Sequence, residues 1–177
     1  EAEIEAREVA AGSRFAILRG GDDSQKSLQR LVEMATQASQ GVESLSTLLA
    51  GLSDEDPAVR YWAATGIGNI GNAAVVARRA ITNALADSSP SVRIAAARAA
   101  ARLGHPDEAI AVLERELQSE HQWGRLAAAI VLDEMDEQAR PALRALETAL
   151  VGQPNKYIVR VANRAINELQ GTSNKVP

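Results

Sequence analysis

The chain has 177 residues, no cysteine, two histidines and a formal net charge of −4. That length suits a single domain with a hydrophobic core of its own. The lack of cysteine excludes disulfides, thiol nucleophiles and thiolate metal sites. We therefore expect neither a metal nor a cofactor.

Apolar residues make up 46% of the chain, but aromatic residues only 3%. A core of Ala, Leu, Ile and Val follows, and these residue types predict an all-α fold. The sequence contains no signal-peptide core and no apolar run of membrane-spanning length, so we expect no membrane partner. Its start at Glu1 suggests a processed chain or a fragment.

Residues 1–23 are predicted to be an N-terminal helix or linker, a candidate contact to a domain outside this sequence, with the helix over residues 1–18. At Gly20-Gly21 a turn is expected. We favour this turn over a phosphate-binding loop, because two adjacent carboxylates follow, which repel phosphate, and no Lys-Ser/Thr pair does. Residues 25–39 then predict an amphipathic helix.

Residues 56–71 (DPAVRYWAATGIGNIG) and 89–104 (SPSVRIAAARAAARLG) are two copies of one pattern, 33 positions apart. Further copies cover residues 122–135 and 155–171. The four copies align on one arginine each, namely Arg60, Arg93, Arg125 and Arg160. A repeat of this period is typical of stacked helical or mixed units.

The copies begin and end with residues that are typical of helix ends. Asp56 or Ser89 is the predicted N-cap, and a proline follows at the first helical position, where it loses no hydrogen bond. Three copies close with a glycine where a left-handed C-cap is expected. These glycines are Gly71, Gly104 and Gly171.

A partner helix is predicted before each copy, over residues 42–52, 74–86, 107–118 and 137–151. Short connections make the two helices of a unit antiparallel neighbours. The sequence thus predicts an α-solenoid of about nine or ten helices with a right-handed superhelical turn. Its repeat domain is expected over residues 24–171, followed by a flexible tail over residues 172–177.

The second helix of each unit carries the pattern V-R-x-x-A-A-x-x-x-x-x-x-G, as in VRYWAATGIGNIG and VRIAAARAAARLG. Ankyrin and tetratricopeptide signatures are absent. Over residues 42–170 the chain resembles short HEAT-type repeats, including the phycobilisome-lyase-like variety. Stacked repeats leave long surfaces and need no reactive residue, so we expect a non-catalytic scaffold for protein–protein or interdomain contact.

A narrower resemblance covers residues 31–39, 54–63 and 87–97. They are similar to the C-terminal HEAT-like extension that follows the catalytic domain of a group of bacterial sulfatases. This implies an accessory domain in the periplasm or outside the cell, whose partner is a sulfatase-type catalytic domain in the same polypeptide or another subunit. The family's C/S-x-P-x-R motif fails here, because Val92 stands where its arginine belongs, so we expect no enzyme in this chain.

The aligned arginines allow two interpretations. They form either an anion-binding ladder or structural ties to acidic and carbonyl groups of adjacent turns, such as Asp54, Asp56 or Asp87. We favour the ties, because packing requirements recur in every repeat of a solenoid and surface anion sites do not.

Tyr61 and Trp62 are adjacent, so about 100° of helical rotation separates their side chains. The positions aligned with Tyr61 are apolar, which predicts a structural role. Those aligned with Trp62 are alanines, so its ring must lie over the gap at Gly66 and Gly68 or on the surface. The predicted partner-binding surface lies on one side of these helices and consists of Trp62, Thr65, Asn69, Arg98 and Arg102.

Two alternatives stay open. Residues 57–104 hold six arginines and one aspartate and would suit a nucleic-acid groove, but the chain has pI ≈ 5.3, whereas such domains usually exceed about 9. A glycosylase- or lyase-like enzyme would need Asp133 or Glu134 opposite Arg102.

The two histidines do not predict a metal site. His105 and His121 lie in turns without a second ligand at the spacing of a helical metal pair.

Overall fold

The computed structural model describes residues 22–175, and the helix predicted over residues 1–18 lies outside them. These residues form a series of α-helices with three 3₁₀ segments between them. The α-helices are α3 (Asp22–Gln37), α4 (Leu45–Gly51), α5 (Pro57–Ile70), α6 (Arg78–Ala84), α7 (Pro90–Arg102), α8 (Pro106–Leu117), α9 (Gln122–Glu134), α10 (Leu143–Leu150) and α11 (Lys156–Gln170). The 3₁₀ segments are η1 (Val42–Ser44), η2 (Gly71–Ala77) and η3 (Asp136–Ala142).

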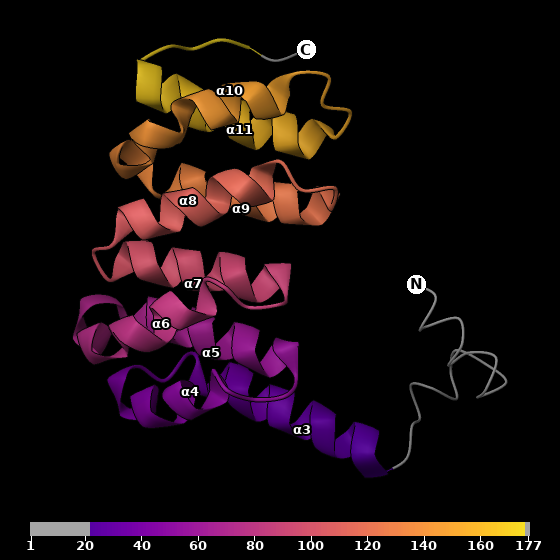
Figure 1. The fold of residues 1–177 in the computed structure, drawn as a ribbon, viewed down its shortest axis with the longest axis vertical. Helices are drawn as coiled ribbons and strands as arrows, with labels where there is room; N and C mark the ends of the chain where they lie inside the picture. The colour runs from indigo at the N-terminus through magenta and orange to yellow at the C-terminus, as the bar shows by residue number, and fades with distance from the viewer. Residues whose placement is uncertain (1–21, 176–177) are drawn as a thin grey trace, which may run out of the picture.

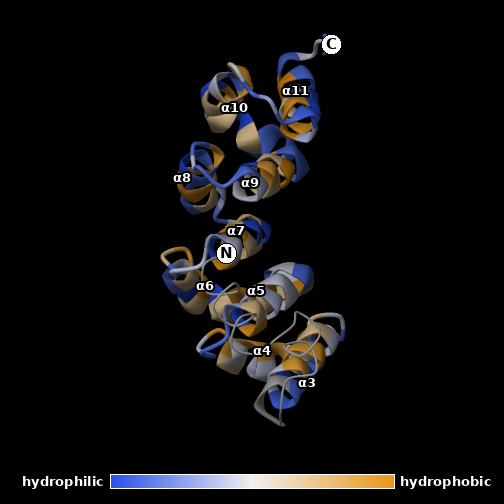
Figure 2. Cartoon of the chain, turned by 90° about the vertical axis from the view of Figure 1, so that its right-hand side faces the viewer, coloured by the Kyte–Doolittle hydropathy of each residue, from blue (hydrophilic) through white to orange (hydrophobic). Residues whose placement is uncertain are grey.

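The helices stack along one long axis, from α3 at one end to α11 at the other (Figure 1). Seen along the helices, α4, α6, α8 and α10 form a first layer, and α3, α5, α7, α9 and α11 form a second (Figure 2). Each first-layer helix packs against the second-layer helix that follows it. The predicted all-α solenoid is confirmed, and the right-handed turn stays a prediction.

The second-layer helices match the four copies, and their ends show which capping predictions hold. The Asp56 carboxylate accepts a hydrogen bond from the backbone N–H of Ala58 at 2.8 Å, as an N-cap does. The prediction for Ser89 is wrong, since its hydroxyl makes no capping bond. There the carboxylate of Asp87 accepts from the Ser89 N–H at 2.8 Å and shapes the turn instead.

All three predicted C-terminal glycines have positive φ, at 63° for Gly71, 85° for Gly104 and 65° for Gly171. A residue with a Cβ rarely adopts that conformation. Gly71 and Gly104 let the chain leave α5 and α7 and turn back toward the first layer, and Gly171 ends α11. At the end of α9 the residue with positive φ is Asp136, at 49°.

Three of the four first-layer helices begin later than predicted, because their first turn is 3₁₀ rather than α. The segment η2 contains a non-helical residue, Ala74, at φ −96° and ψ 22°. The segment η3 contains Pro141, which has no N–H to donate to an α-helical turn. Only α8, which begins at Pro106, is α-helical along its predicted length.

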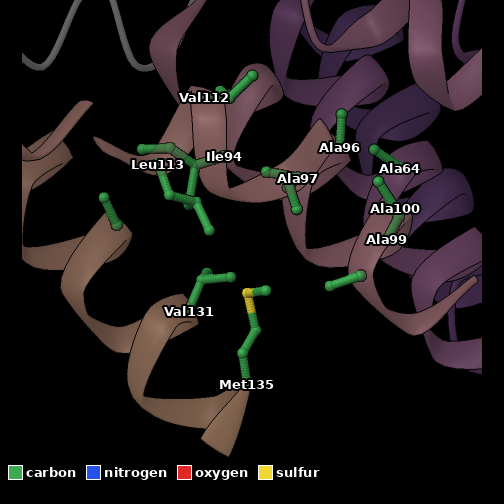
Figure 3. Packing of buried hydrophobic residues seen from close by; sticks show 14 of the residues in the cluster. Ala64, Ile94, Ala96, Ala97, Ala99, Ala100, Val112, Leu113, Val131 and Met135 are labelled. Carbon is green, nitrogen blue, oxygen red and sulfur yellow. The ribbon is translucent and has the colours of Figure 1, made fainter. Parts of the chain in front are cut away.

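The core is dominated by alanine, which allows the helices to approach closely. In Figure 3, Ala99 and Ala100 of α7 lie toward Ala64 of α5, while Val131 of α9 and Met135, directly after its end, point toward α7 from the other side. Two interior glycines extend this packing. A Cβ on Gly66 would lie 2.8 Å from the Cα of Ala38, and one on Gly68 would lie 3.1 Å from the Cα of Ala99.

The gap at Gly66 and Gly68 is therefore filled by neighbouring helices. The atoms nearest to Gly66 belong to Ala38 and Leu48, and those nearest to Gly68 belong to Ala99. Of the two sequence-based options for Trp62, a place over the glycines is the wrong one. Its half-buried ring packs at the edge of the core and is partly open to the surface.

Candidate functional site

Arginine side chains join each second-layer helix to the turn before it. The Nη1 atoms of Arg60, Arg93 and Arg125 each donate to two carbonyl oxygens, those of the residues six and five positions earlier. For Arg60 these oxygens belong to Asp54 and Glu55, at 2.8 and 3.0 Å. The contact closes the loop between the two layers in three successive repeats.

The same arginines also reach toward the following repeat. Arg60 donates to both carboxylate oxygens of Asp87, at 2.7 and 2.9 Å, and Arg93 donates to Glu116 at 2.7 Å. The hydrogen bond from Arg60 holds the pKa of the Asp87 carboxyl below its usual value. Arg125 finds no carboxylate, and its buried Nε has no acceptor within the described part of the chain.

Arg160 differs from the other three. Its side chain makes no hydrogen bond or ion pair to any other residue between 22 and 175, and it lines an open polar hollow of about 580 Å³ together with Asn163, Arg164 and Asn167. Arg160 occupies the aligned position, but no further repeat packs on this side of α11 among the described residues.

A fifth arginine belongs to this series and was missed. Arg30 on α3 donates to Asp54 at 3.3 Å and to Glu55 at 3.1 Å, and Asp54 lies six positions before Arg60, as Asp87 lies six before Arg93. The step from Arg30 to Arg60 is 30 positions, shorter than the 33 that separate the first two copies. Allowing a shorter step would have found Arg30.

A polar network links four second-layer helices and contains three of the predicted surface residues. The amide of Asn69 donates to the Ala38 carbonyl at 3.2 Å and accepts from Arg102 at 3.1 Å. Glu134 on α9 then lies 3.7 Å from Arg102 and 2.9 Å from Arg98. The network therefore brings Asn69, Arg98 and Arg102 together, with Glu134 as their common acid.

The two acids considered for catalysis are both engaged with arginines. Glu134 belongs to the network just described. Asp133 is buried and forms a two-bond ion pair with Arg164 of α11, one bond of which measures 2.8 Å from Nε to Oδ1. The described residues also hold no group of three metal-binding side chains, and no helix among them is long and apolar enough to cross a membrane.

The adjacent aromatic residues pack against each other. The rings of Tyr61 and Trp62 lie 5.5 Å apart at an interplanar angle of 79°, an edge-to-face pair. The hydroxyl of Thr65 donates to the Tyr61 carbonyl at 2.8 Å, within the same helix. Neither Trp62 nor Thr65 bonds to the polar network.

Two hollows of about 350 Å³ each adjoin Tyr61 and Ser91 on the second layer. The first is lined by Pro57, Ala58, Tyr61, Ser89 and Ser91. The second is lined by Tyr61, Ser91, Ile94, Ala95, Arg98, Ala127 and Ile130. Ala95 and Ala127 hold the repeat position that Trp62 fills on α5, so the second hollow opens where this column changes from tryptophan to alanine.

Trp123 at the start of α9 is 67% exposed, and the sequence analysis did not select it. It lies one helical turn before Ala127, which lines the second hollow. Its repeat position is held by the small residues Ala58 and Ser91 in the first two copies. The fourth copy has the larger Ile158 there, but Trp123 is the only aromatic residue at this position of the four copies. A comparison of this column would have pointed to Trp123.

The exposed apolar side chains of α3 continue the same two columns. With Arg30 aligned to Arg60, Leu28 takes the position of Trp123 and Val32 that of Trp62. Leu28 is 60% exposed and Val32 is 56% exposed. We call this surface the apolar band; its exposed or half-buried members are Leu28, Val32, Tyr61, Trp62, Trp123, Ala127 and Ile130, and the buried Ile94 and Ala95 form part of the lining of its hollow.

The comparisons with known proteins agree with this architecture. A family model described as HEAT repeats matches residues 78–167, and a second, described as HEAT repeat, matches residues 45–74. The crystal structure of an engineered protein is similar in fold, with a TM-score of 0.59 at 20% sequence identity over 96% of this chain and 84% of that chain. No curated protein matches. The chain belongs to the family of HEAT-repeat proteins.

Proposed function

We propose that this chain is a non-catalytic scaffold that binds a protein partner through the apolar band. HEAT repeats commonly mediate protein interactions, and the observation that supports this particular surface is the exposure of Trp123 beside a hollow lined mainly by apolar side chains. Tryptophan and tyrosine are enriched among the residues that dominate binding energy at protein interfaces. A contiguous apolar surface on a soluble domain commonly marks such an interface.

The residues predicted from the sequence divide between two roles in this proposal. Arg98 lines the second hollow, and Trp62 contacts Tyr61 at its edge, so these two border the partner. Thr65, Asn69 and Arg102 bond within the chain. The bonds of Asn69 and Arg102 join neighbouring parts of the second layer beneath the partner, whereas the bond of Thr65 stays within α5.

A sulfatase-type catalytic domain is the partner we propose, in the same polypeptide or in another subunit. The resemblance of residues 31–39, 54–63 and 87–97 to the HEAT-like extension of bacterial sulfatases supports it. A chain in which only this association is lost should keep its fold, because each repeat of a solenoid contacts mainly its neighbours.

Binding between the chain and such a catalytic domain, followed by calorimetry, tests this proposal. Trp123→Ala should weaken binding by tenfold or more, as truncation of an interface hot spot of about 2 kcal/mol does. Val76→Ala is the matched control, because Val76 is exposed to a similar degree but belongs to the first layer. Equal losses for the two variants, or no binding by the unaltered chain, would overturn the proposal.

Nucleic-acid binding is the alternative that the basic middle of the chain suggests. Of the six arginines in residues 57–104, five lie within ion-pair distance of a carboxylate. Arg79 alone has no carboxylate partner among the described residues. A phosphate backbone would have to compete for these groups, so we expect no salt-dependent binding to duplex DNA.

A further inference from the structure

We propose that residues 1–18 of this same chain bind the apolar band and compete there with the partner. This inference rests on the proposed function, since it concerns regulation of the same surface. The proposal starts from α3, whose Leu28 and Val32 form the first part of the band and are more than half exposed.

The segment is joined to the solenoid at the start of the band. Residues 1–21 precede Asp22, where α3 begins, and Leu28 lies only six positions further along. Three steps between neighbouring second-layer helices, of about 8–10 Å each, separate α3 from α9. A chain of 21 residues can span up to about 70 Å when extended, so the segment can reach every part of the band.

The composition of the segment suits an apolar surface close to its attachment point. Phe15, Ile17 and Leu18 are the apolar residues nearest to α3, and Phe15 is the only phenylalanine of the chain. Placed over Val32 and the hollows beside Tyr61, they would cover side chains that are open to solvent. Burial of large apolar side chains of this kind is favourable, because it removes apolar surface from water.

The charges of the segment also fit the band when residues 1–8 lie over its far end and the apolar residues lie near α3. Residues 1–8, which reach furthest from α3, contain four glutamates and one arginine. The far part of the band lies on α7 and α9, where Arg98 lines the hollow and Arg102 lies nearby on α7. Arg98 and Arg102 share the single carboxylate of Glu134, which leaves one positive charge over. An acidic end beside that charge favours this orientation, with the apolar part near α3, over the reverse.

Paramagnetic relaxation in the full chain tests the inference directly. Because the chain has no cysteine, Ala10→Cys provides a unique attachment point for a spin label. We expect the methyl signals of Val32, Ala95 and Ala127 to lose most of their intensity. Those of Val75 and Val76, exposed on the first layer, should keep theirs. Equal broadening on both layers, or none, would overturn the inference.

Two further samples show what covers the band: a released variant, whose N-terminal segment should no longer bind, and a mixture of labelled and isotope-enriched copies. Phe15→Asp with Leu18→Asp should restore the band signals, whereas Ser13→Asp, which adds a charge but removes no apolar group, should not. In a sample where the spin label and the isotope are on different copies, the signals should stay sharp. Broadening in that sample would assign the band to a second copy and contradict the inference.

Partner binding separates this inference from the proposed function. If the signals do not broaden while Trp123→Ala still weakens partner binding, the inference is wrong and the proposed function stands. If they broaden, but the released variant binds no catalytic domain, the proposed function is wrong and the intramolecular contact stands. If both hold, the released variant should bind the partner more tightly than the unaltered chain.

Discussion

The interface between α5 and α7 and the outer side of α11 use aligned positions of the repeat in different ways. On α5, Arg60 donates two hydrogen bonds to Asp87 of the following turn, and Gly68 lies against the backbone of Ala99. On α11, Arg160 borders an open polar hollow and bonds to no other described residue.

The difference shows that the contribution of the repeat arginine to stability depends on a carboxylate from the neighbouring repeat. Arg30, Arg60 and Arg93 each receive a carboxylate from the next repeat. Arg160 stands at the same position without one. Arg125, which lies inside the stack, also finds no carboxylate among the described residues. The arginine therefore ties two repeats together only where the following repeat supplies an acid, and at the end of the stack none does.

Replacement of Arg60 and of Arg160 should give the largest difference in stability between the two regions. Arg60→Met leaves the largely buried carboxylate of Asp87 without its partner and should lower the free energy of unfolding by about 3 kcal/mol. Arg160→Met should change it by less than about 0.5 kcal/mol. Urea denaturation measures both, and similar losses for the two variants would contradict the role assigned to the following repeat.

Glycine substitutions compare a closed and an open helix surface. Gly66→Ala places a Cβ 2.8 Å from the Cα of Ala38, so we expect a net loss of about 2 kcal/mol despite the better helix propensity of alanine. In Gly124→Ala the nearest contact is 3.4 Å, to the Ser119 hydroxyl. That variant should be unchanged or slightly more stable in thermal unfolding; a stabilised Gly66→Ala would show that the helices are not closely packed there.

Helix caps should be equal in the two regions, because capping is local. Asp56 caps α5 and Asn155 caps α11, each by accepting a hydrogen bond from the N–H two residues later. Asp56→Ala and Asn155→Ala should each lower the free energy of unfolding by about 1 kcal/mol. Ser89→Ala is the control without a capping bond, and a comparable loss in it would contradict the assignment.

Acid should weaken the α5–α7 interface but not the α11 face. The hydrogen bond from Arg60 lowers the pKa of Asp87 from its ordinary value of 3.8, so this carboxylate stabilises the fold above that pH. The contribution is lost as the pH falls below 3.8 through the folded-state pKa. The stability difference between the unaltered chain and Asp87→Asn should therefore shrink below pH 4, and a constant difference would sink the pH argument.

Much of the fold was predictable because the repeat is visible in the residues themselves. The aligned Val-Arg pairs and the glycines that end the copies give the second-layer helices to within a few residues. The 3₁₀ starts of η2 and η3 were missed, because periodicity does not distinguish the first turn of a helix from a 3₁₀ segment. Ser89 has the right residue type for a cap, but its hydroxyl makes no capping bond, and the sequence does not show this.

The candidate site was less accessible to sequence reasoning. Arg30 was missed because its repeat is three residues shorter, and Trp123 because the columns of Tyr61 and Trp62 were compared but its own was not. The association of Asn69, Arg102 and Glu134 depends on which helices are neighbours, and aligned positions alone do not reveal that Arg98 turns to the same acid.

The most direct test of the binding surface compares Trp62→Ala and Trp123→Ala for partner affinity and stability together. Trp123 is 67% exposed and Trp62 is half-buried. Trp123→Ala should therefore weaken partner binding at least tenfold while stability changes by less than about 0.5 kcal/mol. Trp62→Ala should reduce both. Unchanged affinity in Trp123→Ala, with the chain folded, would show that the apolar band does not bind the partner.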